Sequence, residues 1–405
     1  MKVLVLNCGS SSVKYKVFDM PDTAEPLIQG IAERIGIDGS SIHHKTKGAN
    51  QKKLEKPLQD HDIALREVCG LIAKSEILAS KGDNIIEAIG HRVVHGGPNF
   101  CASVLIDQKV KDAIKQSCRF APLHNPANIA GIEVCEQIFS GIPNIAVFDT
   151  AVHQTMPPRS YLYGIPIELF HKYGIRRYGF QGISHSYVAN EAARILNKNI
   201  NTLNIITCHL GNGSSVTAFK KGESIDTSMG LTPLEGLVMA TRCGDIDPSI
   251  TLYLIESIRM SAAEVNNMLN KNSGLKGLCN KSDMRDILED VNRGVQTAKT
   301  ALEVYCYRIQ KYIGAYVAAM NGVDVIVFTG GIGENSMYVR EKVLENFDYV
   351  GLKLHKTKNQ KKDTIFSTDD SAVKVMNIPT NEELYIALET YKAAEKAKSR
   401  SKKAY

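Results

Sequence analysis

Two segments of this 405-residue chain combine glycines with hydroxyl side chains, a mixture suited to holding phosphate. The first spans residues 7–14 (NCGSSSVK), and the second spans residues 209–216 (HLGNGSSV). Each lies between two short apolar or β-rich runs, which predicts a β-hairpin with a glycine–serine tip. Such a tip exposes backbone N–H groups and hydroxyls without bulky side chains. Two such loops, far apart in the chain, indicate two related halves that close around a polyphosphate.

Lys14 alternates with Ser10 and Ser12 along the first hairpin, so the three side chains are expected on one face of it. A lysine beside two hydroxyls suits phosphate binding. An ordinary polar hairpin would show the same residues, and only the presence of the second loop favours the phosphate-binding interpretation.

A third glycine-rich segment, residues 329–335 (TGGIGEN), follows the apolar run 323–328. Glycines after a strand let a ligand approach the backbone, although most such turns are structural. The segment does not match G-x-G-x-x-G, and G-x-x-x-x-G-K-[ST] occurs nowhere in the chain, which argues against a P-loop kinase.

Three charged residues lie where α/β proteins build sites. Asp149 follows the apolar run 145–148, and it could equally be a helix N-cap. Arg92 and Arg242 lie in or beside glycine-containing turns, and arginine binds carboxylate or phosphoryl oxygens in a bidentate manner. For Arg242 the plainer alternative is a salt bridge to Asp245. No histidine spacing is typical of a zinc site.

Strand-like and helix-like segments alternate along the chain, which predicts an α/β fold. Strands are expected over 89–94, 145–148 and 323–328, and helices over 295–320, from Asn125, and from near Asn381. The lysine-rich segment 45–56 is expected as a surface excursion, and a domain boundary is expected near residue 150.

Composition narrows the class of protein. No apolar run has the length of a membrane helix and no signal peptide is evident, so a cytoplasmic protein without membrane contact is expected. The nine cysteines contain no C-x-x-C pair, which favours reduced thiols. The net charge of +6 resides largely in the tail 392–405, where no aromatic residues interleave as a nucleic-acid surface would require.

Taken together, eight segments resemble the acetokinase family of the actin/sugar-kinase/Hsp70 superfamily, in the family's order and over nearly the whole chain. They are residues 7–14, 90–97, 121–126, 148–153, 209–213, 241–248, 283–285 and 330–335.

The resemblance implies two duplicated ribonuclease-H-like (actin-like ATPase) domains with an interdomain cleft. The first domain would comprise residues 1–150 and a returning C-terminal helix over 386–405, and the second would comprise 151–385. The implied activity is that of an acetate kinase, an ATP:acetate phosphotransferase that reversibly forms acetyl phosphate and ADP with Mg²⁺, or alternatively Mn²⁺. A homodimer is also implied.

The resemblance also assigns roles to individual residues. Asn7 and Glu382 would hold the metal, and the catalytic group would comprise Asp149, Arg92, Arg242, Gln181 and His124. The acetate methyl would lie against Val94, Leu123, Phe180 and Pro233. The phosphates and nucleotide would contact Ser10, Ser12, Lys14, His209, Leu210, Gly211, Asn212, Gly213, Asp283, Met284, Arg285, Gly331, Ile332, Gly333, Glu334 and Asn335.

One position departs from the family. The family pattern Phe-His-Gly-Thr-Ser-His reads FQGISH over residues 180–185, so Gln181 replaces a histidine thought to stabilise the transition state. Gln181 keeps an N–H donor of similar reach but carries no charge. Loss of charge assistance to one such hydrogen bond costs about 1–2 kcal/mol of transition-state stabilisation, or about 5–30-fold in rate. We therefore expect a slower enzyme whose turnover Gln181→His raises.

Other functions remain open at this point. A propionate or butyrate kinase differs only by methylenes in a pocket, each worth about 1–3 kcal/mol. Pyrophosphate as donor is disfavoured because residues 331–335 retain the nucleotide loop. A non-catalytic nucleotide-binding module would fit the loss of the histidine, but Asn7, Arg92, Asp149, Arg242 and Glu382 all remain.

Overall fold

The computed structural model describes residues 1–9, 11–75, 86–122 and 124–401. The chain divides into two compact units, the first formed by Met1–Gln154 with Asn381–Tyr405, and the second by Thr155–Thr380. The domain boundaries predicted from the sequence lie after residues 150 and 385. None of the described helices is long and apolar enough to cross a membrane.

The first unit contains an eight-stranded sheet in the order β5-β4-β3-β2-β1-β6-β8-β7. Its strands are β1 (Lys2–Cys8), β2 (Ser12–Asp19), β3 (Ile28–Glu33), β4 (Ser41–Thr46), β5 (Lys52–Glu55), β6 (Ala88–Val93), β7 (Val104–Leu105) and β8 (Asn144–Phe148). Its helices are α1 (His61–Ala73), α3 (Gln108–Gln116), α4 (Asn125–Ile138) and α16 (Glu382–Ser401). The segment 45–56 is therefore not a mere excursion, because β4 and β5 extend the sheet.

The second unit contains a five-stranded sheet in the order β11-β10-β9-β12-β13. Its strands are β9 (Asn204–Leu210), β10 (Ser214–Lys220), β11 (Glu223–Thr227), β12 (Val325–Thr329) and β13 (Lys374–Asn377). Its helices are α5 (Pro158–Tyr161), α6 (Ile167–Tyr173), α7 (Gly182–Ile195), α8 (Pro248–Glu256), α9 (Ala262–Lys271), α10 (Gly274–Cys279), α11 (Met284–Asn292), α12 (Gln296–Met320), α13 (Gly330–Asn335), α14 (Met337–Leu344) and α15 (Lys356–Gln360).

The two sheets share one five-strand plan. In the first unit β1 pairs antiparallel with β2, β2 pairs antiparallel with β3, and β1-β6-β8 are parallel. In the second unit β9 pairs antiparallel with β10, β10 with β11, and β9-β12-β13 are parallel. The predicted hairpins at 7–14 and 209–216 join the first two strands of each plan, so the predicted duplication is confirmed.

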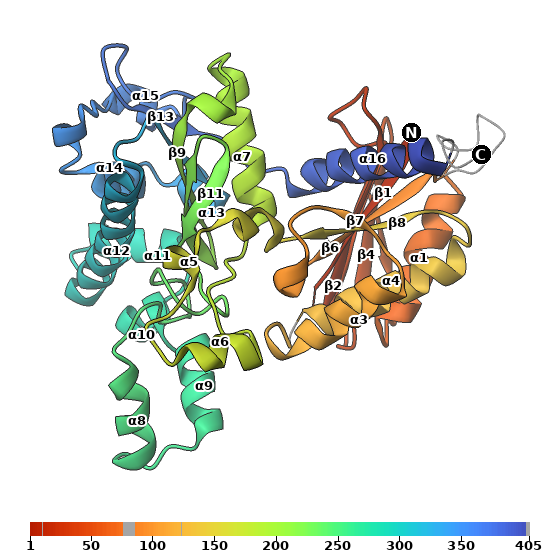
Figure 1. The fold of residues 1–405 in the computed structure, drawn as a ribbon, viewed down its shortest axis with the longest axis horizontal. Helices are drawn as coiled ribbons and strands as arrows, with labels where there is room; N and C mark the ends of the chain where they lie inside the picture. Colours follow the sequence, from red (N-terminus) through yellow and green to blue (C-terminus); the bar gives the residue numbers. More distant parts are fainter. Residues whose placement is uncertain (10, 76–85, 123, 402–405) are drawn as a thin grey trace. The chain divides into compact units, whose positions relative to one another are not determined.

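Helices cover both faces of each sheet. In the first unit α1 and α4 pack on one face, while α16 packs along β1, β6 and β8 on the other, although it is the last helix of the chain (Figure 1). Gly90 allows this close approach, because a Cβ there would lie 2.9 Å from Ile386 Cγ2 and would also meet Thr390. In the second unit α12 supplies Leu302, Ile309 and Ile313 to the core, and α7 packs on β9 and β12.

Candidate active site

Three polar residues of the first unit meet where its parallel strands end. The β1–β6 register pairs Leu6 with His91, which brings Asn7 beside Arg92. The β6–β8 register pairs Arg92 with Val147, and Asp149 follows two residues later, just after β8 ends. The carboxyl ends of parallel strands form the usual binding edge of an α/β sheet.

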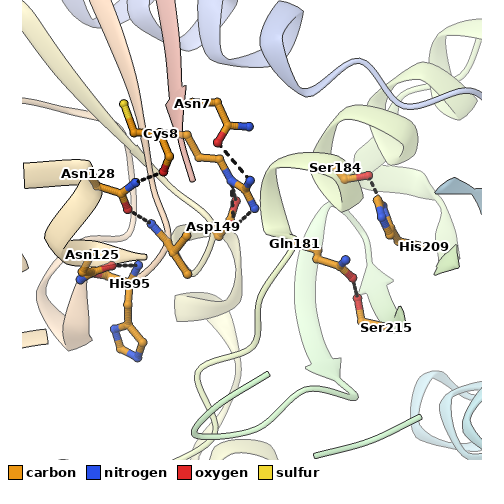
Figure 2. Close-up of polar contacts among 12 residues, drawn as sticks. Asn7, Cys8, His95, Asn125, Asn128, Asp149, Gln181, Ser184, His209 and Ser215 are labelled. Atoms are coloured by element: carbon orange, nitrogen blue, oxygen red, sulfur yellow. Dashed lines mark hydrogen bonds and ion pairs between the residues drawn. The ribbon is translucent and has the colours of Figure 1, made fainter. Parts of the chain in front are cut away.

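Arg92 contacts both Asn7 and Asp149, and Figure 2 labels these two partners. Its Nη2 donates to Asp149 Oδ2 at 2.7 Å, and its Nε lies 3.2 Å from the same oxygen and 3.3 Å from Oδ1. Its Nη1 donates to Asn7 Oδ1 at 3.3 Å. This forked guanidinium of Arg92 binds Asp149, which is only 2% exposed, so the guanidinium is held in one orientation.

Burial and charge act in opposite directions on this pair. Burial favours the neutral form of Arg92, but the charges of Asp149 and Glu382 outweigh it and raise the pKa of the guanidinium. Burial raises the pKa of the Asp149 carboxyl above its ordinary value, although Arg92 and His124 oppose the shift. Glu382 also raises the pKa of Asp149, which places a second acidic group within electrostatic reach of the pair.

Of the other predicted residues of the first hairpin, Lys14 lies beside Asn7. The β1–β2 register places Lys14 directly opposite Asn7, so both side chains share one face of the sheet. Lys14 is exposed, and a hollow of about 240 Å³ opens beside it, lined also by Lys16, His43 and Lys45. Ser12 begins β2, whereas Ser10 lies outside the described residues.

Two asparagines hold the loop after β6. Asn125 accepts from His95 N at 3.1 Å and donates to His95 O at 2.9 Å, and Asn128 accepts from Val94 N at 3.2 Å (Figure 2). Asn125 does begin α4 as predicted, but the N-cap is His124, and the Asn125 side chain serves the loop instead of the helix. Val94 is buried, and Leu123 lies outside the described residues.

In the second unit, two glycine-containing loops meet at the ends of β9 and β12. The parallel register pairs His209 with Thr329, which brings residues 209–213 beside residues 330–335. Gly330 has φ +77°, and a Cβ there would lie 2.7 Å from Leu210 O, so the close approach depends on glycine. His209 Nδ1 lies 2.7 Å from Ser184 Oγ, which in turn lies 2.8 Å from Thr380 Oγ1.

Gln181 and Arg242 flank the bare backbone of Gly213. A Cβ on Gly213 would lie 3.3 Å from Arg242 Nη1 and 3.5 Å from Gln181 Nε2. Gln181 is the N-cap of α7 with φ 57°, and its Oε1 accepts from Ser215 Oγ at 2.6 Å (Figure 2). Two N–H donors therefore face one glycine of the second hairpin.

The alternative interpretation of Arg242, a salt bridge to Asp245, is wrong. Asp245 instead accepts from Gly236 N at 2.8 Å and from Tyr312 Oη at 2.7 Å. Arg242 Nη1 reaches Pro233 O at 3.3 Å, and no carboxylate forms an ion pair with Arg242 among the described residues. Burial lowers the pKa of this guanidinium. A partly buried arginine beside neutral partners suits an anionic ligand.

The third glycine-rich segment forms the short helix α13. Asn335 Nδ2 donates to Gly331 O at 2.9 Å, and Glu334 Oε1 accepts from Gly330 N at 3.0 Å. The fully buried Arg340 donates to Gly333 O at 2.8 Å and to Glu334 O at 2.9 Å. The side chains of this segment thus fix its backbone, while Gly331 has no neighbour within 4 Å of its Cβ position.

The segment 283–285 begins α11. Asp283 is the N-cap, and its carboxylate forms an exposed ion pair with Arg285 at 2.6 Å. Met284 is buried in the core with Leu210 and Leu237, so only its backbone is available to a nucleotide.

The structure thus joins Asn7, Arg92 and Asp149 in one unit, and Gln181, Arg242, Gly213 and Pro233 in the other. The predicted methyl pocket draws Val94 from the first unit and the buried Phe180 and Pro233 from the second, and it remains a prediction.

The sequence reading assigned no role to Asn128, His185 or Ser215. For His185 a signal was available, because it follows Gln181 by four residues at the start of a helix and so lies on the same helix face.

Comparison with known proteins agrees with this arrangement. Residues 2–388 match the model of the acetokinase family. Acetate kinase of Carboxydothermus hydrogenoformans is 53% identical over 392 residues, which are 96% of this chain and 98% of that protein.

Two solved structures are also similar. The acetate kinase of Porphyromonas gingivalis superimposes with a TM-score of 0.91 at 42% identity, covering 97% of this chain and 99% of that one. A propionate kinase from Francisella tularensis gives 0.90 at 43% identity, covering 96% and 99%. Since both the sequence match and the folds extend over nearly the full length, this chain belongs to the acetokinase family.

Proposed function

We propose that this protein is an ATP-dependent acetate kinase, which transfers the γ-phosphoryl group of ATP to acetate and forms acetyl phosphate and ADP reversibly. The main support is the environment of Arg242. Its guanidinium is partly buried beside Gln181 and Gly213, and it forms no ion pair with a carboxylate among the described residues. The family and its named relatives supply the reaction class to which such an anion site belongs.

The reaction needs little proton chemistry from the protein. Acetate is already ionised at neutral pH, so one of its oxygens attacks the γ-phosphorus while the bond to the ADP oxygen breaks. Phosphoryl transfer is then a matter of positioning and electrostatic stabilisation. Arg92 and Arg242 bind the carboxylate and the transferred group, and Asp149 keeps the Arg92 fork oriented instead of acting as a base.

A divalent metal fits the residues of the first unit. No group of three or more His, Cys, Asp or Glu side chains could hold a metal within the described part of the chain. Mg²⁺ does not require one, because it is usually held by one or two protein oxygens together with substrate phosphates. Asn7 and Glu382 offer an amide and a carboxylate oxygen. The negative charge of Glu382 raises the pKa of both Arg92 and Asp149, so its carboxylate lies within electrostatic reach of them. The metal would neutralise phosphate charge there, and Mn²⁺ has the same oxygen preference.

A propionate kinase is the second candidate, because a propionate kinase structure is as similar to this chain as an acetate kinase structure. One additional methylene is worth only about 1–3 kcal/mol in a pocket.

A homodimer is part of the proposal. Helix α8 contains no buried residue, and apolar side chains gather along it and just beyond its end. They are Ile250, Leu252, Tyr253, Ile255 and Ile258, with exposures of 37–59%. Exposed apolar patches of this kind mark interaction surfaces. We also propose cytoplasmic localisation, as expected from the sequence.

The test is to trap acyl phosphate with hydroxylamine in the presence of ATP and Mg²⁺, with acetate, propionate and butyrate in parallel. Mg²⁺-dependent product that favours acetate is the expected result. Preference for a longer acid would retain the mechanism and change the substrate. Folded protein that binds ATP but forms no product with any acid would refute the proposal in favour of a nucleotide-binding module.

A further inference from the structure

Four side chains of the second unit form one continuous line of hydrogen bonds that ends on Gln181. Thr207 Oγ1 lies 2.7 Å from His185 Nδ1, and His185 Nε2 lies 2.6 Å from Ser215 Oγ. Ser215 Oγ donates to Gln181 Oε1 at 2.6 Å. Thr207, His185 and Ser215 are completely buried, and they come from β9, α7 and β10 respectively.

The structure places the Gln181 amide with Oε1 toward Ser215, and the protons of the line follow from this orientation. A serine hydroxyl has one proton, and Ser215 gives it to Gln181 Oε1. The short contact with His185 Nε2 therefore requires that this nitrogen carries a proton and donates to Ser215 Oγ. In a neutral imidazole the other nitrogen is then bare, so His185 Nδ1 accepts from Thr207 Oγ1. All three bonds point the same way, which strengthens each of them.

The same orientation determines which end of the Gln181 amide faces the glycine loop. Because Oε1 is taken by Ser215, the amide NH₂ is turned away from the line, and Nε2 lies 3.5 Å from the Cβ position of Gly213. Arg242 Nη1 lies 3.3 Å from the same position. If the amide were turned over, its NH₂ would meet the Ser215 hydroxyl and its oxygen would face an incoming anion.

We propose that Thr207, His185 and Ser215 are positioning residues that lock the Gln181 amide with its NH₂ toward the transferred phosphoryl group. Gln181 then acts as a neutral, oriented donor beside the charged Arg242. This inference rests on the proposed phosphoryl transfer and identifies how a chain with glutamine at this position stabilises the reacting group.

A double-mutant cycle tests the functional part. Ser215→Ala removes the hydroxyl that holds Oε1, and Gln181→Ala removes the donor itself. Each change should lower kcat about tenfold while KM for ATP stays within about twofold, the size expected for one oriented hydrogen bond. The double variant should be no slower than Gln181→Ala alone, because Ser215 acts only through Gln181. Additive losses would overturn the proposal.

Thr207 provides a matched pair of variants. Thr207→Val removes the hydroxyl with little change in shape and should lower kcat, whereas Thr207→Ser keeps the hydroxyl and should retain it. Equal activities for the two would contradict the role of Thr207, and this pair keeps the test decisive if Ser215→Ala does not fold.

The tautomer of His185 is a readout that does not depend on activity. In protein labelled with ¹⁵N-histidine, His185 should show a protonated Nε2 and a bare Nδ1, and Thr207→Val should disturb this pattern. A protonated Nδ1 in the wild-type protein would refute the positioning line. If no acid is phosphorylated by the wild-type protein, the proposed function fails, and the tautomer alone still decides whether the line exists.

Discussion

At the scale of single residues, the Arg92 fork shows why arginine is needed at that position. Three nitrogens of one planar group reach both Asp149 and Asn7, an arrangement that a lysine ammonium cannot reproduce. The same group carries the charge that the proposed reaction needs at the end of β6.

Arg92→Lys should therefore lower kcat about 100-fold, in the range seen when one oriented transition-state donor is lost. Steady-state acyl-phosphate formation measures the effect. Arg66→Lys is a matched control, because Arg66 forms an exposed pair with Asp62 on α1 at 2.7 Å and should leave activity unchanged. Full activity in Arg92→Lys would show that the fork does not contribute.

A second residue-scale prediction concerns stability in acid. His91 is buried, and burial lowers its pKa to about 4 even though Asn144 Oδ1 accepts a hydrogen bond from its ring at 2.7 Å. An unfolded histidine titrates near pH 6.5. Between pH 6.5 and 4 the unfolded chain therefore binds a proton that the native protein does not. The stability that neutral His91 provides is complete above pH 6.5 and is lost as the pH falls to 4, by about 3 kcal/mol.

Urea unfolding at several pH values between 4 and 7.5 measures this slope. His91→Gln keeps a polar group opposite Asn144 and should flatten the slope by about one proton. His171→Gln, at an exposed histidine of α6, should leave it unchanged. An unchanged slope in His91→Gln would mean that His91 does not set the acid response.

At the scale of elements, α13 depends on a cation that comes from the next helix. Arg340 on α14 donates to the last carbonyls of α13 and to both oxygens of Asn359, at 2.7 Å for Oδ1 and 2.9 Å for the backbone. Burial lowers its pKa to about 10, so it remains charged at neutral pH. A cation at a helix C-terminus also interacts favourably with the helix dipole.

Arg340→Met should leave these carbonyls without their donors and loosen the segment 331–335. We expect KM for ATP to rise about tenfold with a smaller change in kcat, since a buried polar group left unpaired costs about 1–3 kcal/mol. Titration calorimetry with ADP checks the affinity directly. Lys342→Met removes an exposed cation from the same helix and should bind ADP normally.

Elements dominated by buried apolar runs were predictable from the sequence. The predicted strand at 145–148 and the helix at 295–320 agree with β8 and α12, because their burial imposes an apolar pattern. Strand β5 was not predicted, because all four of its residues are exposed and show no apolar pattern.

The site was only partly predictable for a related reason. Glycine and serine at the hairpin tips have a local signature, so the loops could be found. The partners of Arg92 and Arg242 are set by tertiary packing: Asp149 directly follows a neighbouring parallel strand, and Asp245 binds Tyr312 instead of the nearby Arg242. The line from Thr207 to Gln181 joins three elements, and its only local signature is the four-residue spacing from Gln181 to His185.

At the scale of the whole molecule, the apolar face of α8 leads to a prediction on assembly. Leu252→Asp places a charge on a residue that is 57% exposed in the single chain. If α8 is part of a homodimer interface, this change should convert the protein to a monomer in sedimentation measurements. Tyr349→Asp, at a residue that is 66% exposed elsewhere in the second unit, should leave assembly unchanged. A dimer that tolerates Leu252→Asp would place the interface elsewhere.

The division of the chain also sets an order of events during synthesis on the ribosome. Residues 155–380 are contiguous and can fold as soon as they emerge, whereas the sheet begun by β1 waits for α16. At about 5–20 residues per second, the strand carrying Asn7 stays without its covering helix for roughly 20 to 80 seconds. Until α16 is made, the strands around Gly90 lack the helix that packs on them, and we expect the nascent chain to depend most on a chaperone in that interval.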